Sequence, residues 1–283
     1  MTPIQINING TWIQESIPEL HALLKRPLPD GLGVFETMRM VDSTIPLLSS
    51  HYQRLQHSAT ALNFRLPDLP GPEQILDGIK EQLFDAPNLL NAKVRWGIVY
   101  QSERLQQETA FTPPLWFLEV IPGPAYSEFD TRPLHLGVYS EKRKQSDTSA
   151  IHKLLHEALY DEAYALALSE GWDDAFILNT SGKIIESVNS NLFVWDGTHL
   201  RTPPLSEGCV GGIYRNHLME VCKQAGIRVQ ESALNKEDLE LAKEIMLCNA
   251  LRGVRAVTHF AGKQFSSEFS SKLYAMCRTA ERP

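Results

Sequence analysis

Three groups of residues in this chain have the types and spacing to do chemistry together. Lys153 opens an amphipathic stretch, Glu186 follows 33 residues later in a mostly apolar segment, and Ile213 of a Gly-Gly-Ile turn follows 27 residues after Glu186. An amine can form a Schiff base, a carboxylate can hold a ring nitrogen protonated, and unpaired N–H groups at a helix entrance can bind phosphate. Pyridoxal 5'-phosphate (PLP) needs these three groups from a protein. The spacing therefore predicts Lys153 as the catalytic residue.

Each of these residues also has an ordinary explanation when it is taken alone. Lysines are mostly exposed, so Lys153 fits a surface position near a helix start as well. Strand alternation lets Glu186 face either the solvent or a cationic partner inside. A helix entrance such as the one at Ile213 commonly faces water. Arg54 stands on a predicted helix, where it is either a bidentate phosphate donor or a solvated side chain.

Composition and charge exclude several classes of function. The chain has 283 residues, 43% of them apolar and 22% charged, which suits one large or two medium globular domains. Its formal net charge is −7 and no basic block stands out, so nucleic-acid binding is not expected. The longest basic cluster, residues 141–144, is interpreted as a solvated loop.

The sequence also predicts where the protein resides and which sites it lacks. No signal peptide and no run of eighteen apolar residues is visible, so no membrane partner is expected. The cysteines contain no CxxC pair, which disfavours disulfides and zinc and favours a reducing cytoplasm. They are Cys209, Cys222, Cys248 and Cys277. A Gly-x-Gly at Gly31 lacks the third glycine and the βαβ setting of a nucleotide-binding loop.

The pattern of apolar residues and breakers predicts a two-domain mixed α/β chain. The first half has a hairpin with an Asn-Gly turn followed by strands and helices. These lie at 5–13, 31–40, 44–48, 51–64, 72–84, 92–101 and 115–121. Pro122-Gly123-Pro124 is a strong breaker. We therefore expect a smaller N-terminal domain at 1–119, a linker at 120–129 and a larger C-terminal domain at 130–283.

The second half alternates strands with helices in the same way. A long helix is predicted over 153–170, and a hairpin is predicted around the turn 180–182. A further helix ends at Gly226, which suits a C-terminal cap. The tail is predicted to alternate a helix and two strands before a final helix. Lys153 is thus expected on the first turn of a helix, and Glu186 on a strand.

Five segments in this order resemble the class IV aminotransferases, which are PLP enzymes of fold type IV. The resemblance runs from Asn7 to the C-terminus. The segments are GLGVFETMR, HYQRLQHSATAL, Lys153 with GWDDA, ESVNSNLF, and TPPLSEGCVGGIYR. The family includes branched-chain aminotransferase, D-amino-acid aminotransferase and aminodeoxychorismate lyase. The resemblance implies an α+β two-domain fold like that of D-amino-acid aminotransferase, with the cofactor between the domains, and a homodimer.

The resemblance also implies roles for individual residues. Lys153 would be the Schiff-base lysine and proton carrier, and Glu186 the partner of the pyridine nitrogen. The phosphate would be held by Arg54 and by the N–H groups of Ile213 and Tyr214. The other implied cofactor-binding residues are Asn191, Gly212, Asn249 and Ala250. The implied substrate-binding residues are Phe35 and Arg252. No metal is implied.

The sequence departs from the family pattern at several positions. Tyr214 stands where the family usually has threonine, and His156 where it usually has asparagine. His152 stands directly before the lysine, where the family usually has isoleucine, so position 152 is the rival for the Schiff-base position. The family's spacing from lysine to glycine fits Lys153 with Gly171, which favours Lys153. The usual arginine-glycine pair after residues 92–100 is absent, which removes one substrate-carboxylate ligand.

The resemblance leaves three functions open. Cys248-Asn249-Ala250-Leu251 resembles the lyase form of the last active-site loop. The leading expectation is therefore a lyase that converts 4-amino-4-deoxychorismate to 4-aminobenzoate and pyruvate. The alternative is an aminotransferase for branched-chain or D-amino acids. A non-catalytic PLP-binding relative is the third reading, motivated by Tyr214 and His156.

Overall fold

The computed structural model describes residues 5–13, 32–63, 66–83, 91–100, 115–124, 126, 128–155 and 157–281. The chain divides into two compact units. Unit 1 comprises Met1–Ser127 and Lys153–His156, and unit 2 comprises Glu128–His152 and Glu157–Pro283. The break falls within the predicted linker 120–129, but the first residues of that range belong to a strand. Residues 153–156, which we expected in the C-terminal domain, belong to unit 1.

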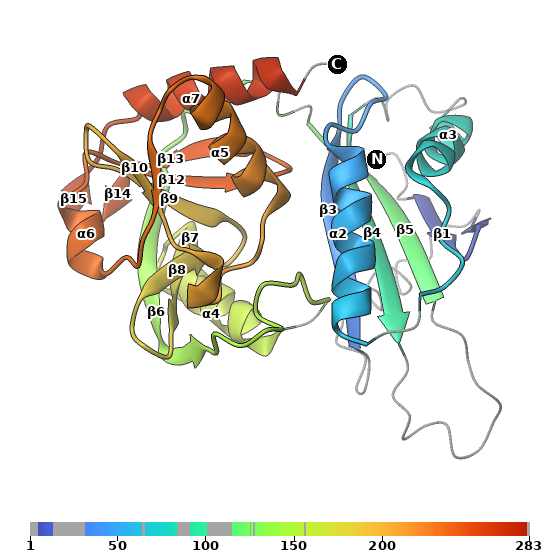
Figure 1. The fold of residues 1–283 in the computed structure, drawn as a ribbon, viewed down its shortest axis with the longest axis horizontal. Helices are drawn as coiled ribbons and strands as arrows, with labels where there is room; N and C mark the ends of the chain where they lie inside the picture. Colours follow the sequence, from blue (N-terminus) through green and yellow to red (C-terminus); the bar gives the residue numbers. More distant parts are fainter. Residues whose placement is uncertain are drawn as a thin grey trace. The chain divides into compact units, whose positions relative to one another are not determined.

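Within the described residues, unit 1 is built on an antiparallel five-stranded sheet in the order β2-β1-β5-β4-β3 (Figure 1). The strands are β1 (Gln5–Ile8), β2 (Thr11–Ile13), β3 (Leu32–Met40), β4 (Ala92–Tyr100) and β5 (Leu115–Pro122). The β1–β2 turn has Asn9 and Gly10 at φ 48° and 89°. Only residues that tolerate positive φ suit such a turn, which explains the Asn-Gly signal.

Two helices, α2 (Leu48–Ala61) and α3 (Pro72–Leu83), belong to unit 1. The buried residues of α2 recur at helical spacing, and α2 packs on β3. They are His51, Leu55, Ser58 and Ala59. The core beneath includes Met38, Trp96 and Leu118. The strand predicted at 44–48 is wrong: Thr44 forms only an isolated bridge with Val41, and the chain then enters α2.

Within the described residues, ten strands form the sheet of unit 2. Its strands are β6 (His135–Lys144), β7 (Asp174–Asn179), β8 (Ile184–Ser187), β9 (Asn191–Trp195), β10 (Leu200–Thr202), β11 (Val229–Glu231), β12 (Glu244–Asn249), β13 (Gly253–Val257), β14 (His259–Phe260) and β15 (Lys263–Gln264). The main path is β11-β10-β9-β8-β7-β6-β14-β15, and β12 pairs with both β9 and β13. The sheet therefore places β12, which comes from a distant part of the chain, beside β9, and β9 also pairs with its neighbour in the chain, β8.

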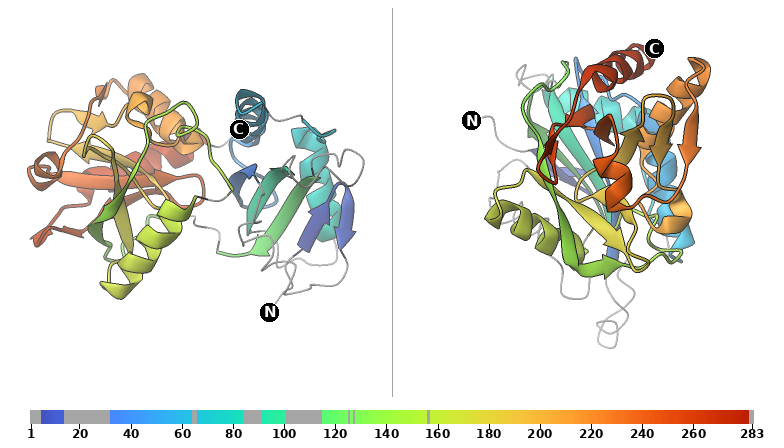
Figure 2. Two further views of the ribbon diagram at one scale, coloured as in Figure 1. Left: turned by 90° about the horizontal axis from the view of Figure 1, so that it is seen from below. Right: turned by 90° about the vertical axis from the view of Figure 1, so that its left-hand side faces the viewer.

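The helices of unit 2 cover this sheet (Figures 1 and 2). They are α4 (Ala158–Ser169), the 3-10 turn η3 (Leu205–Glu207), α5 (Ile213–Gln224), α6 (Lys236–Glu240) and α7 (Glu268–Ala280). Helix α4 packs on β6 and β7. Helices α5 and α7 pack against each other, α5 also against β12, and α7 against β12 and β13. None of the described helices has the length and apolar character needed to cross a membrane.

The long helix predicted over 153–170 is wrong at its start. Helix α4 begins only at Ala158, and Leu154 forms an antiparallel bridge with Val34 of β3. The amide of Phe35 donates to the carbonyl of Lys153 (3.1 Å), and the amide of Leu155 donates to the carbonyl of Gly33 (2.8 Å). β3 is at the end of the sheet order, so its outer N–H and C=O groups need partners. Pairing with β3 overrides the helical pattern of this segment.

Candidate functional site

Lys153 lies in unit 1 beside an aromatic ring. Its Nζ is 4.5 Å from the centroid of the Phe35 ring, and its side chain is half-buried. The face of an aromatic ring attracts a cation, so this contact holds the amine in one place. The guanidinium of Arg95 is 5.2 Å from the centroid of the same ring and is paired with the buried Glu119. Phe35, expected from the resemblance to contact substrate, thus lies next to the predicted catalytic lysine.

Gly33 explains how the lysine segment can approach β3 so closely. A Cβ atom at this position would lie 2.7 Å from the carbonyl oxygen of Ile98 and 3.1 Å from Leu155. Any side chain would therefore push the 153–155 segment or β4 away from β3. The glycine allows the backbone pairing that positions Lys153.

Arg54 is held by a buried carboxylate in unit 1. Its Nε and Nη2 donate to the two oxygens of Glu36 at 2.7 and 2.5 Å, and His51 Nδ1 lies 2.6 Å from Glu36 Oε2. Burial alone would raise the pKa of Glu36, but the Arg54 and His51 neighbours lower it to about 2. Strand alternation places Glu36 on the face covered by α2, where it needs these partners. Arg54 is therefore fixed by a bidentate pair, and its phosphate contact stays a prediction.

Glu186 lies in unit 2 and is buried, with 3% of its surface exposed. Its Oε1 accepts from Lys144 Nζ (3.0 Å) and from the Tyr160 hydroxyl (2.6 Å). Its Oε2 accepts from the backbone N–H of Val210 (2.9 Å). Of the two possibilities that alternation left open, the structure therefore selects the inward one, with Lys144 as the cationic partner.

The interpretation of residues 141–144 as a solvated loop is wrong for Lys144. Strand β6 continues through this cluster to Lys144, which is 3% exposed, whereas the Lys142 side chain is 58% exposed. The β6–β7 register shifts between Tyr139 and Lys144, so strict alternation is lost there. Sequence reasoning missed Lys144 and Tyr160, because the residues that pair with them are distant in the chain.

The Gly-Gly-Ile turn forms the entrance of α5. Gly212 is the N-cap, no side chain caps the first turn, and no acidic residue lies in it. The N–H groups of such a first turn carry partial positive charge, so this entrance suits an anion. Asn191 Nδ2 donates to the carbonyl of Val210 (2.8 Å), and a Cβ on Gly212 would lie 1.9 Å from Asn191 Oδ1. The structure thus brings together three predicted cofactor-binding residues, Asn191, Gly212 and Ile213.

Tyr214, the residue that departs from the family pattern, turns its side chain into the protein. It is buried, and its ring lies near Arg278 of α7. Burial raises the pKa of its hydroxyl far above the usual range, so the phenol stays neutral. Only its backbone N–H is placed at the helix entrance. The other departure, His156, lies outside the described residues.

Asn249 organises the loop at residues 248–251, which the resemblance implies is the last active-site loop. Its Oδ1 accepts from the N–H groups of Leu251 (3.1 Å) and Arg252 (2.9 Å). Its Nδ2 donates to the Ser190 hydroxyl (2.9 Å). Asn249 therefore links the β12–β13 turn to the β8–β9 turn. Ala250 lies in the same turn, and Arg252 pairs with Asp130 at 3.4 Å. The cofactor and substrate roles of Asn249, Ala250 and Arg252 stay predictions.

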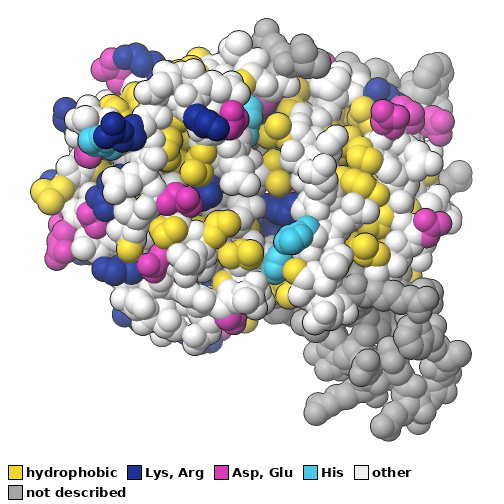
Figure 3. Space-filling model, viewed as in Figure 1, with side chains coloured by type: hydrophobic (Ala, Val, Ile, Leu, Met, Phe, Trp, Pro, Cys, Tyr) yellow, Lys and Arg dark blue, Asp and Glu magenta, His cyan; other side chains and the backbone are white. Residues whose placement is uncertain are grey.

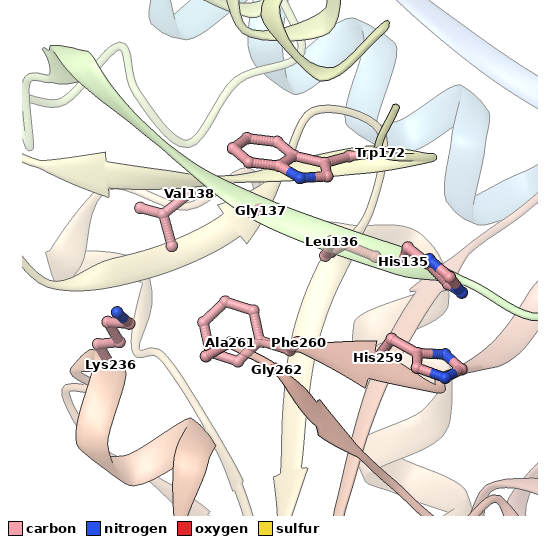
Figure 4. A pocket seen from close by; sticks show the side chains of 10 residues that line it. All are labelled: His135, Leu136, Gly137, Val138, Trp172, Lys236, His259, Phe260, Ala261 and Gly262. Atoms are coloured by element: carbon pink, nitrogen blue, oxygen red, sulfur yellow. The ribbon is translucent and has the colours of Figure 1, made fainter. Parts of the chain in front are cut away.

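A groove of about 390 Å³ in unit 2 lies away from these residues (Figure 4). Trp172 lies over Gly137 on one side, where a Cβ atom would collide with the indole. His135 and His259 face each other at one end, with ring centroids 4.1 Å apart, and Lys236 stands at the other end. None of the predicted site residues lines this groove. On the face shown in Figure 3, basic and acidic side chains are interspersed over unit 2.

Comparisons with known proteins identify the family. The family model for amino-transferase class IV matches residues 33–260. A putative branched-chain-amino-acid aminotransferase from Methanocaldococcus jannaschii is 26% identical over 94% of this chain and 91% of its own. An aminodeoxychorismate lyase from Vibrio harveyi is 25% identical over 91% of this chain and 94% of its own.

The fold is found among solved structures as well. An aminotransferase from Brucella abortus bound to PLP has the same fold, with a TM-score of 0.81, 20% identity and 99% coverage of both chains. The α+β two-domain fold of type IV expected from the resemblance is therefore confirmed. Because the family model spans most of the sequence, from the strand beside Lys153 to β14, this chain belongs to the class IV aminotransferase family.

Proposed function

We propose that this protein is a PLP-dependent aminotransferase that acts on branched-chain or D-amino acids. The observation that supports it most directly is the buried carboxylate of Glu186, whose Oε2 accepts a hydrogen bond from Val210, two residues before the α5 entrance. A buried carboxylate next to an anion-binding helix entrance suits a cofactor with a basic ring nitrogen and a phosphate.

The chemical types of the predicted site residues suit this cofactor. PLP supplies an aldehyde and an electron sink for breaking bonds at the amino-acid carbon. Lys153 would hold the cofactor and move protons to and from the reacting carbon. Glu186 would pair with the ring nitrogen, and the N–H groups of Ile213 and Tyr214 would bind the phosphate with Arg54. Phe35 would pack against the substrate side, and Arg252 would bind a substrate carboxylate.

Transamination is better supported than the lyase reaction that the sequence favoured. The similar curated proteins are mostly named branched-chain aminotransferases, and one is named aminodeoxychorismate lyase. The lyase reading rested on the loop Cys248-Asn249-Ala250-Leu251. In the structure Asn249 makes hydrogen bonds within its own turn and to the β8–β9 turn, and these bonds favour neither reaction. The reading as a non-catalytic relative has no support from these names.

An amino-donor screen tests the proposal. The purified protein is incubated with PLP, 2-oxoglutarate and single L- or D-amino acids, and glutamate is measured. We expect glutamate formation with L-leucine, L-isoleucine or L-valine. Absence of glutamate with every L- and D-amino acid, in a protein that binds PLP, would contradict transamination.

Replacing the predicted catalytic lysine tests the site assignment in the same assay. We expect Lys153→Ala to abolish glutamate formation and the covalent PLP adduct trapped by borohydride, because no amine would remain to hold the cofactor aldehyde. Lys142→Ala, at an exposed lysine paired with Glu162, is the matched control and should leave both unchanged. Activity that survives Lys153→Ala would mean that another residue carries the reaction.

The lyase remains the second candidate because a curated lyase matches most of the chain and Cys248–Leu251 resembles its loop. Its substrate, 4-amino-4-deoxychorismate, would yield 4-aminobenzoate and pyruvate without any 2-oxo acid. Pyruvate release from this substrate, with no glutamate from amino acids, would replace the first proposal by the second.

A further inference from the structure

The ammonium group of Lys144 is buried, and its hydrogen-bonding capacity is fully used. It donates to Glu186 Oε1 (3.0 Å), to the Tyr160 hydroxyl oxygen (2.6 Å) and to the carbonyl of Ala150 (2.9 Å). An ammonium group has three N–H donors, and these three acceptors match them. Lys144 and Glu186 expose 3% and 4% of their side chains, so water screens their attraction little.

Tyr160 completes this arrangement as a neutral donor. Its hydroxyl accepts from Lys144 and donates to Glu186 Oε1 at 2.6 Å. Burial and the adjacent Glu186 raise the pKa of Tyr160 well above its usual value, so the phenol keeps its proton. Glu186 Oε1 therefore receives two donors from within unit 2, and Oε2 receives one from Val210.

The same groups connect three segments that the proposed function uses. Lys144 binds the carbonyl of Ala150, and the amide of Gly211 donates to the carbonyl of Ile151 at 2.9 Å. Residues 150–151 lie just before Lys153. Glu186 binds the amide of Val210, which directly precedes Gly211. Lys144 is thus hydrogen-bonded both to the chain just before Lys153 and to the carboxylate of Glu186. The carboxylate in turn is hydrogen-bonded to the turn at 210–212.

We propose that Lys144 is a positioning residue that fixes Glu186 and couples it to residues 150–151 and to the turn at 210–212. It also shares the negative charge of Glu186, so the carboxylate is not wholly available to a second cation. This second statement rests on the proposed function, because the second cation would be the protonated pyridine nitrogen of PLP. The coupling itself is a property of the protein without cofactor.

Hydrogen–deuterium exchange in the PLP-free protein tests the coupling. We expect Lys144→Met to speed exchange of the Val210 and Gly211 amides by about tenfold or more, the order expected for losing a hydrogen bond to a charged group. Lys142→Met, two residues away and exposed, should leave them unchanged. Amides of β4 in unit 1 serve as the internal reference. Unchanged exchange at Val210 and Gly211 in Lys144→Met would overturn the proposal.

The variant leaves a buried carboxylate without its cation, which can prevent folding. Lys144→Met combined with Glu186→Gln removes both charges and provides the second test. The amide oxygen of Gln can still accept from Val210, but the bond from residue 144 to Ala150 is lost. We expect this double variant to fold and to show faster exchange at residues 150–151. Wild-type exchange there would overturn the coupling.

The charge sharing has a spectroscopic readout that a purely structural role would not move. With ¹⁵N-labelled PLP bound, the chemical shift of the pyridine nitrogen reports its protonation. We expect Lys144→Met to raise the pH at which this nitrogen titrates by about one unit, a factor of ten in the proton equilibrium, and Lys142→Met to leave it unchanged. An unchanged titration would refute charge sharing. Failure of the wild-type protein to bind PLP would instead refute the proposed function, and the exchange result would still decide the coupling.

Discussion

Buried charged side chains, each with identifiable partners, define the chemistry of this protein at the scale of single residues. Glu36 is paired with Arg54, Glu119 with Arg95, and Glu186 with Lys144. Glu244 accepts from the amides of Phe269 and Ser270 at the start of α7. Burying an unpaired charge is costly, so these partners are required wherever strand alternation turns a carboxylate inward.

Asp174 is a buried carboxylate that forms no ion pair within 4 Å among the described residues, and it should make stability depend on pH. It accepts from the Ser187 hydroxyl (2.8 Å) and from the amides of Ala175 and Val188. Burial raises its pKa from 3.8 to about 6. The folded state therefore holds the proton more tightly than the unfolded state. Stability contributed by this group is complete below about pH 4 and is lost as pH rises through about 6.

We expect Asp174→Asn to raise the free energy of unfolding by about 1–3 kcal/mol at pH 8 and to change it little at pH 4. An amide stays uncharged at both pH values, and its oxygen can still accept from the two backbone amides. Urea unfolding at the two pH values measures the difference. The neighbouring exposed Asp173→Asn is the control. Equal effects of Asp174→Asn at pH 4 and pH 8 would contradict a raised pKa.

At the scale of elements, the α5 entrance depends on one of its two glycines. A Cβ on Gly212 would collide with Asn191 Oδ1, whereas a Cβ on Gly211 would meet no atom closer than 3.6 Å. Gly212 has φ −66°, so alanine can adopt the same backbone conformation. The requirement for glycine at Gly212 therefore comes from the close approach of Asn191.

We expect Gly212→Ala to lower PLP affinity by about tenfold or more and to destabilise the fold by about 1–3 kcal/mol, because Asn191 must move and its bond to Val210 is lost. Gly211→Ala is the matched control and should leave both values near wild type. Absorbance titration with PLP and urea unfolding give the two measurements. Similar losses in both variants would show that the Asn191 contact is not the cause.

The segment that carries Lys153 adopts a structure that differs from the one its own sequence pattern predicts. Residues 153–170 have a helical arrangement of apolar residues, yet 153–155 pair with β3 and α4 starts at Ala158. Pairing satisfies the outer backbone groups of β3, and Gly33 leaves room for it. Periodicity within a segment carries no information about such a distant partner.

At the scale of the whole molecule, the chain folds as two units, and the predicted residues are divided between them. Phe35, Arg54 and Lys153 belong to unit 1, whereas Glu186, Asn191 and the α5 entrance belong to unit 2. The lysine segment joins unit 1 although its neighbours on both sides in the chain belong to unit 2. Each unit therefore carries some of the residues that are predicted to bind the cofactor.

The homodimer implied by the family resemblance is a prediction for the whole molecule. We expect sedimentation equilibrium to give twice the chain mass of 31.9 kDa. The mass should be independent of protein concentration in the micromolar range, since obligate dimers bury large apolar interfaces. A species of 31.9 kDa under these conditions would contradict the dimer.

The sequence by itself determined the class of chemistry. An amine, a carboxylate in an apolar strand and a glycine-rich helix entrance are local features, because each is recognised from residue types and turn signals within a few residues. Alternation left the direction of the Glu186 side chain open, and only the structure decided it. The order of five such segments then indicated the family, which the family model confirms. The Asn9-Gly10 turn and α2, α3 and α5 follow from the same local rules.

The tertiary structure alone decided which residues support these groups. Lys144 meets Glu186 across 42 positions of the chain, and Arg54 meets Glu36 across 18. Lys153 does not lie in the predicted helix, because its segment forms hydrogen bonds with the edge of β3. Only the folded chain brings β3 near this segment. Burial and pairing depend on residues distant in sequence, and a chain read one segment at a time does not contain that information.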